Sequence, residues 1–167
     1  LFDEHIPEWR LWTLNPQKGL PEREGITPET SFVGAGMRNN PRLHYVPCRL
    51  SHVPALFTRA MEPDVVLLHT SMPRHGVVSL GIEVNVLPAA IEACRARGGK
   101  VIAQANPLMP FTYGDAIVPL SSIDMLFEAE EPLTTGSPGV LDDTSREIGA
   151  RIAARIKDGS TLQMGIG

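Results

Sequence analysis

The residues with the clearest potential to contact a ligand are Gly165, Ile166 and Gly167, which follow the strand-like segment 161–164. Glycine lets backbone N–H groups approach a ligand closely, and ligands in open α/β sheets bind beyond the carboxyl ends of strands. The pattern therefore predicts a ligand-contacting turn at residues 165–167. A helix normally follows such a turn, so we expect the chain to be a fragment.

A second group of polar residues follows the apolar segment 100–106. Asn106 precedes a proline, which favours an extended exit from the strand, and Thr112 and Asp115 come shortly afterwards. Their amide, hydroxyl and carboxylate are suited to converge on a ligand at the sheet edge. The same residue types also satisfy backbone groups within loops, and the residues alone leave both interpretations open.

A third, weaker candidate is Arg38, which follows Gly36 in a loop of small residues. Its guanidinium is suited to bind a carboxylate or a phosphate, and a surface salt bridge is the alternative interpretation. The five histidines include no pair with the spacing of ligands on one helix face, so no metal site is predicted. Of these, His69 is expected to be a hydrogen-bonded core residue.

The segments that would position these residues alternate between strand and helix patterns. Strands are expected at 11–14, 43–47, 64–71, 100–106, 123–128 and 161–164. Helices are expected at 51–59 with Ser51 as N-cap, at 86–97 capped near Asn85, and from a capping box at 144–147. The β-branched run at 64–71 predicts a strand covered on both faces.

This order predicts an α/β fold with an open, mostly parallel sheet flanked by helices and truncated at both ends. We expect three regions. Residues 1–40 form an irregular N-terminal segment, residues 41–135 an α/β domain, and residues 136–167 a linker, helix and first strand leading to a second domain that is absent from the chain.

The amino-acid composition limits the kinds of partner that this chain is suited to bind. Hydrophobic residues make up 43% of the 167 residues, charged residues 20%, and the net charge is −4. These values are ordinary for a globular protein and argue against nucleic acid as the main partner. No apolar run approaches the roughly 20 residues that a membrane span needs. Cys48 and Cys94 are expected to be free thiols in a reducing compartment, which predicts a cytoplasmic location.

Several motifs together resemble the acetyl-CoA hydrolase / 4-hydroxybutyrate CoA-transferase family of class I CoA-transferases. The resemblance covers about residues 31–167, and its motifs are Ser31 to Arg38, Pro63-Asp64-Val65, Ser71-x-Pro73-x-x-Gly76-x-x-Ser79-Leu80-Gly81, Val101 to Asp115 with Asn-Pro-x-Met-Pro-x-Thr-x-Gly-Asp, and Asp158 to Gly167 with Leu-Gln-x-Gly-Ile-Gly.

The resemblance implies transfer of CoA from an acyl-CoA to a small carboxylate through a glutamyl-CoA thioester. The family's nucleophilic glutamate lies downstream of this chain, so residues 1–167 alone are expected to be inactive. The resemblance makes residues 165–167 part of an oxyanion loop, with Gln163 orienting it. It also implies a homodimer and no permanently bound cofactor. The expected acyl pocket is lined by Asn106, Met109, Pro110, Thr112 and Gly114.

Two alternatives stay open at this point. The same nucleophile serves an acyl-CoA hydrolase, in which water replaces the acceptor carboxylate. A non-enzymatic ligand-binding domain could also keep the α/β scaffold, because fold alone does not settle function.

Overall fold

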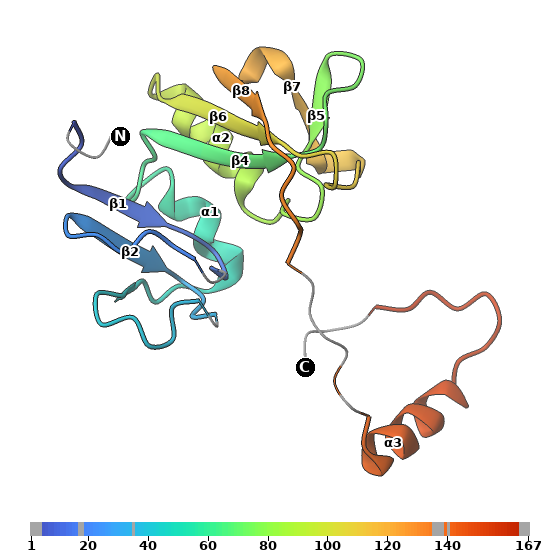
Figure 1. The fold of residues 1–167 in the computed structure, drawn as a ribbon. Coiled ribbons are helices and arrows are strands. Elements are labelled where there is room, and N and C mark those ends of the chain that lie inside the picture. The colour runs from blue at the N-terminus through green and yellow to red at the C-terminus, as the bar shows by residue number, and fades with distance from the viewer. Residues whose placement is uncertain (1–4, 17–18, 35, 135–138, 140, 164–167) are drawn as a thin grey trace. The chain divides into compact units, whose positions relative to one another are not determined.

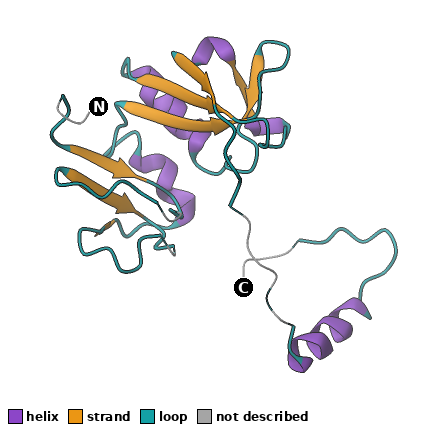
Figure 2. Ribbon diagram, in the orientation of Figure 1, coloured by secondary structure: helices purple, strands orange, loops and turns teal. Residues whose placement is uncertain are grey.

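The computed structural model describes residues 5–16, 19–34, 36–134, 139 and 141–163 (Figure 1). The chain divides into two compact units, Leu1–Thr134 and Thr135–Gly167. Strands and short helices make up the first unit, and the described residues of the second unit contain one helix (Figure 2). No helix in the described ranges is long and apolar enough to cross a membrane.

The first sheet lies in the segment that was expected to be irregular. It has the order β1-β2-β3 and consists of β1 (Trp9–Trp12), β2 (Ile26–Thr30) and β3 (His44–Tyr45), all parallel. The expected strand at 11–14 thus begins two residues earlier. Trp12 packs edge-on against Phe57, with ring centroids 5.1 Å apart, and so joins this sheet to the core.

The second sheet has the order β4-β6-β8 and is also parallel, as predicted. Its strands are β4 (Val65–Thr70), β6 (Lys100–Ala105) and β8 (Met125–Glu128). Alternate residues of β4 and β6, such as Leu68 and Ala103, are buried in the core. Because the three strands are parallel, their carboxyl ends lie at one edge of the sheet (Figure 1).

Helix α2 (Leu87–Ala96) connects β4 and β6 and confirms the helix expected at 86–97. Ile91 and Cys94 lie on its buried face, and Pro88 occupies the first turn, where a missing N–H costs little. The cap was expected at Asn85 or a nearby residue, and the N-cap is its neighbour Val86. The valine side chain has no polar atom and makes no capping hydrogen bond, while the Leu87 N–H donates to the Val84 carbonyl oxygen at 2.9 Å.

The prediction that both faces of β4 are covered was also wrong. Burial alternates along the strand, and Leu67 on the face opposite α2 is 61% exposed. Met125 and Phe127 of β8 lie on this same exposed face through the register with β6. Strand β4, which forms from the apolar run at 64–71, therefore has one buried and one exposed face in this chain.

Short elements complete the first unit. The helix expected at 51–59 is a single turn, α1 (Val53–Leu56), whose N-cap is His52 and not Ser51, because Ser51 lies in the preceding 3-10 turn. The remaining elements are η1 (Leu50–His52), β5 (Val77–Ser79), η2 (Gly114–Ala116), β7 (Ile117–Pro119) and η3 (Leu120–Ser122), with β5 and β7 antiparallel.

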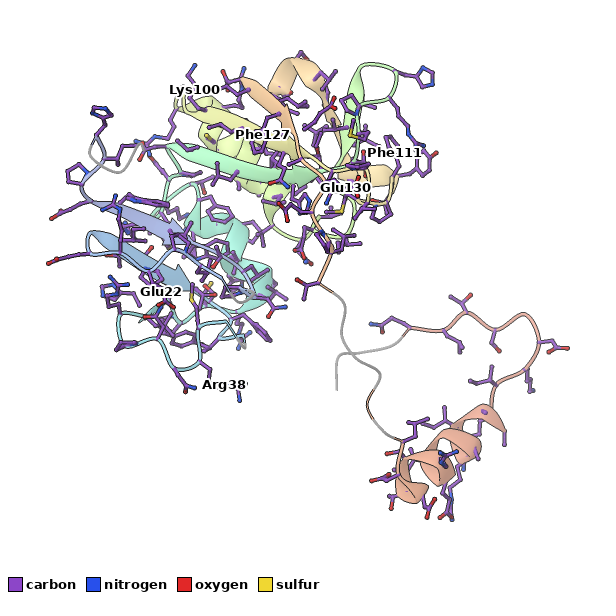
Figure 3. All side chains as sticks on the ribbon, in the orientation of Figure 1. Glu22, Arg38, Lys100, Phe111, Phe127 and Glu130 are labelled. Atoms are coloured by element: carbon purple, nitrogen blue, oxygen red, sulfur yellow. The ribbon has the colours of Figure 1, made fainter. Side chains whose placement is uncertain are left out.

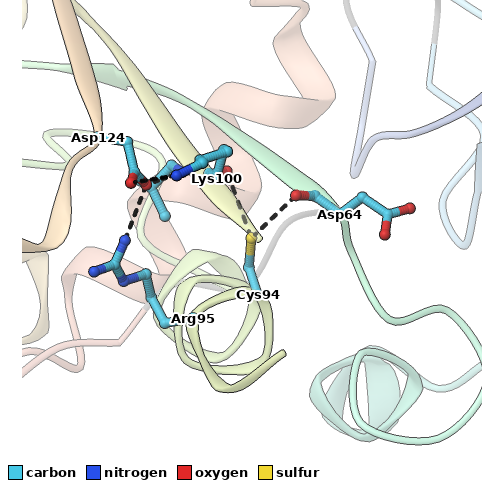
Figure 4. A network of polar contacts seen from close by, with 6 residues as sticks. Asp64, Cys94, Arg95, Lys100 and Asp124 are labelled. Atoms are coloured by element: carbon cyan, nitrogen blue, oxygen red, sulfur yellow. Dashed lines mark hydrogen bonds and ion pairs between the residues drawn. The ribbon is translucent and has the colours of Figure 1, made fainter. Parts of the chain in front are cut away.

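The amino end of β6 is fixed by Asp124, which precedes β8 (Figure 4). Its carboxylate accepts a hydrogen bond from the Val101 N–H at 2.9 Å and pairs with Arg95 at 2.9 Å and Lys100 at 3.3 Å. The bond from Val101, with the two cations, lowers the pKa of Asp124. This network joins α2, β6 and β8 at the edge opposite the carboxyl ends of the strands.

The second unit contains α3 (Asp143–Ala153). The expected capping box at 144–147 was wrong, because Asp142 is the N-cap and its carboxylate accepts a hydrogen bond from Ser145 N at 2.7 Å. A carboxylate there also interacts favourably with the helix dipole. The expected strand at 161–164 does not form over residues 161–163. A strand needs a partner, and the described part of this unit offers none.

Candidate functional site

The carboxyl ends of β4, β6 and β8 lead into three segments that begin at Ser71, Asn106 and Ala129. Polar side chains and special backbone conformations are concentrated in these segments. This is the edge at which parallel α/β sheets bind ligands, so it is the candidate site. Backbone hydrogen bonds hold the start of two of these segments to the end of the neighbouring strand. The Asn106 N–H donates to the Thr70 carbonyl oxygen at 2.8 Å, and the Ala129 N–H donates to the Ala105 carbonyl oxygen at 3.0 Å.

Asn106 is fully buried and joins all three segments through its side chain. Its Nδ2 donates to His69 Nε2 at 2.8 Å and to the Glu131 carbonyl oxygen at 2.7 Å. Its Oδ1 accepts from the N–H of Leu108 at 3.0 Å and of Glu131 at 3.4 Å. Because a carbonyl must accept and an N–H must donate, these partners fix the orientation of the amide. All of its hydrogen-bonding capacity is used within the protein.

His69 Nε2 accepts the hydrogen bond from Asn106, so this nitrogen carries no proton and the ring is neutral. Burial lowers the pKa of His69, and the attraction of the Glu131 carboxylate opposes this shift. The neutral ring is the form that the Asn106 amide requires. The expectation of a hydrogen-bonded histidine at the end of β4 is confirmed.

A second group of contacts is centred on Ser79, at the end of β5. Its Oγ accepts from the N–H groups of Thr112 at 3.0 Å and Gly81 at 3.1 Å and donates to the Thr112 carbonyl at 2.8 Å. The Thr112 hydroxyl donates to the Gly81 carbonyl at 2.7 Å. Ser71 Oγ accepts from Ser79 N at 3.0 Å. These three hydroxyl groups hold the loops after β4, β5 and β6 together.

Gly81 and Met109 pack closely behind this group. Gly81 has φ +61°, and a Cβ placed there would lie 2.2 Å from Met109 Sδ. Met109 is only 4% exposed. The structure therefore places Met109 as a packing residue between the two loops, beneath the surface that the loops present.

Two of the residues expected to line a pocket, Asn106 and Thr112, have hydrogen-bond partners within the protein. Asn106 and Thr112 satisfy backbone groups of neighbouring loops, and within the described ranges neither bonds to the other or to Asp115. Pro110, Gly114 and Asp115 are exposed at the same loop. The segment thus has an inner set of side chains that fix its shape and an outer set that faces solvent.

The other expected site residues lie elsewhere or outside the described ranges. Arg38 is exposed in the connection between β2 and β3, and within the described residues it forms no ion pair (Figure 3). Gln163 is exposed in the second unit. Gly165, Ile166 and Gly167 fall outside the described residues. The described ranges hold no group of three side chains suited to bind a metal ion.

Sequence reasoning did not identify Ser71, Ser79 and Glu131 as partners at this edge. Ser71 and Ser79 do belong to the motif Ser71-x-Pro73-x-x-Gly76-x-x-Ser79-Leu80-Gly81, but the spacing of this motif predicts no role for either hydroxyl. Glu131 contributes only its backbone to Asn106, so its residue type carried no signal.

Comparisons with known proteins agree with this architecture. The family model of the acetyl-CoA hydrolase/transferase N-terminal domain matches residues 26–135. The chain is 39% identical over 141 residues to 4-hydroxybutyrate coenzyme A transferase of Clostridium kluyveri, covering 81% of this chain and 32% of that protein. It is 31% identical over 176 residues to succinyl-CoA:acetate/propanoyl-CoA:succinate CoA transferase of Fasciola hepatica, covering 100% of this chain and 36% of that protein.

Solved structures are similar as well. 4-Hydroxybutyrate CoA-transferase of Porphyromonas gingivalis matches with a TM-score of 0.65 and 31% identity, over 85% of this chain and 37% of that one. RipA of Yersinia pestis matches with a TM-score of 0.74 and 26% identity, over 86% and 35%. The chain spans about a third of the length of the curated relatives, 32% and 36% in the two named above. On these matches and on its fold, the chain belongs to the acetyl-CoA hydrolase/transferase N-terminal domain family.

Proposed function

We propose that the protein carrying this chain is a CoA-transferase, which moves CoA between an acyl-CoA and a small carboxylate. The observation that carries the proposal is the 39% identity, over 81% of this chain, to a 4-hydroxybutyrate coenzyme A transferase. Three further relatives are also named as CoA transferases, for succinyl-CoA with acetate or propanoyl-CoA with succinate, for succinyl-CoA with cyclohexane-1-carboxylate, and for butyryl-CoA with acetate.

The proposed reaction uses a glutamate that lies outside residues 1–167. Its carboxylate attacks the thioester carbonyl, the C–S bond breaks, and CoA leaves as a thiolate from an acyl-glutamyl anhydride. The thiolate then attacks the glutamyl carbonyl and releases the acyl group as a carboxylate. An acceptor carboxylate repeats the sequence in reverse and takes the CoA. The direct reaction of a free carboxylate with an acyl-CoA is thereby divided into steps in which a nucleophile attacks an activated carbonyl.

In this proposal the chain supplies the rigid half of the site. Asn106, Met109 and Thr112 act as positioning residues, because their polar atoms or their bulk are used inside the protein. Pro110 and Gly114, which are exposed on the same loop, line the acyl pocket. A fixed loop keeps its groups in place without reorganisation during the reaction, which is the basis of electrostatic preorganisation.

Further residues take the roles that family membership suggests. The N–H groups of residues 165–167 stabilise the tetrahedral oxyanion, with Gln163 orienting that segment, and Arg38 binds an anionic group of a substrate. The substrates are an acyl-CoA and a small carboxylate, with no permanently bound cofactor. The protein acts as a homodimer in the cytoplasm, where the two free thiols stay reduced.

The proposal is tested by product analysis with the full-length protein. Acetyl-CoA is supplied with and without butyrate, and the products are separated by chromatography. A transferase forms butyryl-CoA and acetate with no net release of free CoA. Release of free CoA at the same rate with and without butyrate would instead identify an acyl-CoA hydrolase, which the family description also covers. No thioester turnover with either mixture or with other short carboxylates would contradict the proposal.

A further inference from the structure

The sheet β4-β6-β8 carries an apolar surface on the face opposite α2. Leu67, Ile102 and Met125 lie side by side in register across the three strands. Leu67 is 61% and Met125 63% exposed, whereas Ile102, on the middle strand between them, is half-buried. Val65 and Phe127, which Figure 3 labels, extend this row along β4 and β8 and are also exposed. We call these five side chains the open face.

Polar groups border the open face at both ends of the strands. Lys100, the register partner of Val65, lies at the amino end and pairs with Asp124 at 3.3 Å. His69 and Gln104, which are register partners, lie toward the carboxyl end, beside the candidate site. The open face is therefore a bounded apolar patch. Apolar patches with a polar rim mark places where another element or molecule packs.

Both connections within this sheet lie on the α2 face. Strand β4 is connected to β6 through α2, and β6 is connected to β8 through β7. Ile91 of α2 and Val118 of β7 belong to the same buried cluster as Leu68 of β4. The strand order advances in one direction, and right-handed crossovers that advance in one direction fall on one face. A crossover that runs in the opposite direction would fall on the open face.

The dimensions of the open face suit a single helix. Three neighbouring strands are about 10 Å wide, and a helix with its side chains is about 10–12 Å across. A stable interface between separate proteins involves about 20–30 residues a side, far more than this patch offers. The chain spans 32% and 36% of the length of the two curated relatives described above, so a protein of that length has many further residues to supply the helix.

We infer that the open face is covered by an amphipathic α-helix from a part of the same polypeptide outside residues 1–167. The helix places aliphatic side chains against Leu67, Ile102 and Met125 and polar ones toward solvent. All-parallel sheets are covered on both faces in nearly all proteins that contain them, which is the physical basis of the inference. A crossover helix runs back from the carboxyl ends of the strands to their amino ends, so its first turn lies beside His69 and the candidate site.

Photo-cross-linking of the full-length wild-type sequence identifies the cover. Photo-methionine is incorporated in place of methionine, the protein is irradiated, and denaturing electrophoresis separates links within one polypeptide from links between copies. Mass spectrometry then identifies the peptides joined to Met125. We expect links within one polypeptide to a single segment outside residues 1–167. Links only between copies would make the open face an interface between two copies, and links only to residues within 1–167, or no links, would also overturn the inference.

Thermal unfolding of full-length variants gives an independent test. Leu67→Ser should lower Tm by about 5 °C or more, because truncation of a covered leucine leaves a cavity. Leu50→Ser is the matched control, since Leu50 is 57% exposed and lies in η1, away from the open face. It should leave Tm nearly unchanged. An equal change in Tm for the two variants would contradict the inference. Neither test depends on thioester turnover, so a failure of the proposed function would leave both results interpretable.

Discussion

Asn106 Nδ2 lies 2.8 Å from His69 Nε2, and this hydrogen bond joins the ends of two neighbouring parallel strands. The same amide group holds the backbone of Glu131, which follows the third strand. One buried side chain thus sets the mutual position of three loops at the candidate site, the edge at which open α/β sheets generally bind ligands. Asn106 belongs to the Asn-Pro-x-Met-Pro motif, and the structure explains the asparagine by its role in fixing the shape of this edge.

Replacement of Asn106 by aspartate should be strongly destabilising. Asn106→Asp keeps the size of the side chain but cannot donate to His69 or to the Glu131 carbonyl, and it places a charge in a fully buried position. Loss of buried hydrogen-bond partners costs about 1–3 kcal/mol, and more for a charged group. Thermal unfolding of the full-length protein at neutral pH should show a clear drop in Tm. Asn39→Asp, at an exposed position, serves as the control and should leave Tm nearly unchanged.

Stability should fall in mildly acidic solution because of His69. Its folded-state pKa is lowered by burial, so below pH 6.5 the unfolded chain binds a proton that the folded protein excludes. The contribution is fully present above the unfolded pKa of about 6.5 and is lost as pH falls toward the lowered folded value. His69→Gln should flatten this part of the curve of unfolding free energy against pH. His44→Gln, at an exposed position, should not, and an identical curve for wild type and His69→Gln would refute the assignment.

Gly81→Ala should disturb the contact between the loops after β5 and β6. Its φ of +61° is unfavourable for alanine, and the added Cβ would meet the buried Met109 side chain at 2.2 Å. Backbone strain of this kind costs about 1–2 kcal/mol, and displacement of Met109 adds to it. Gly98→Ala is the matched control, since its φ is +80° and nothing lies within 4 Å of the added Cβ. Equal destabilisation by the two variants would show that the Met109 contact has no energetic importance.

The cap of α3 can be tested in a peptide covering residues 139–160. Asp142→Ala should reduce helix content measured by circular dichroism, because the carboxylate that accepts from Ser145 N is lost. Thr144→Ala should have little effect, since Thr144 is not the cap. The bond to Ser145 lowers the pKa of Asp142, so helix content should also decrease as pH falls through that lowered value. A larger effect of Thr144→Ala would restore the capping box as the true start of the helix.

The parallel sheet was predictable because its strands are dense apolar segments separated by a well-marked helix. Helix α2 shows Leu87, Ile91 and Cys94 at helical spacing, and glycines end it. Strand β2 was missed, because Pro28 and Glu29 argue against a strand. Its stability depends on pairing with β1 and β3, and on the 2.8 Å ion pair that Glu29 forms with Arg10, none of which is local in sequence.

The position of the candidate site in the fold was predictable from the sequence, but the role of each side chain within it was not. A strand end followed by Asn106-Pro107 indicates a ligand-binding edge in any parallel sheet. The partners that decide what Asn106 does lie 37 and 25 residues away in the chain, at His69 and Glu131. Distances of this kind follow from sheet register and tertiary packing, so residue types and spacing could not distinguish an amide that binds substrate from one that fixes a loop.

The most direct test of the proposed function is to trap the covalent intermediate. The full-length protein is incubated with an acyl-CoA in the absence of an acceptor carboxylate, digested with a protease, and analysed by mass spectrometry for a peptide carrying CoA as a thioester. The proposal predicts one modified glutamate, located beyond residue 167, and loss of the modification when an acceptor carboxylate is added. A thioester on a residue within 1–167, or turnover without any covalent CoA adduct, would contradict it.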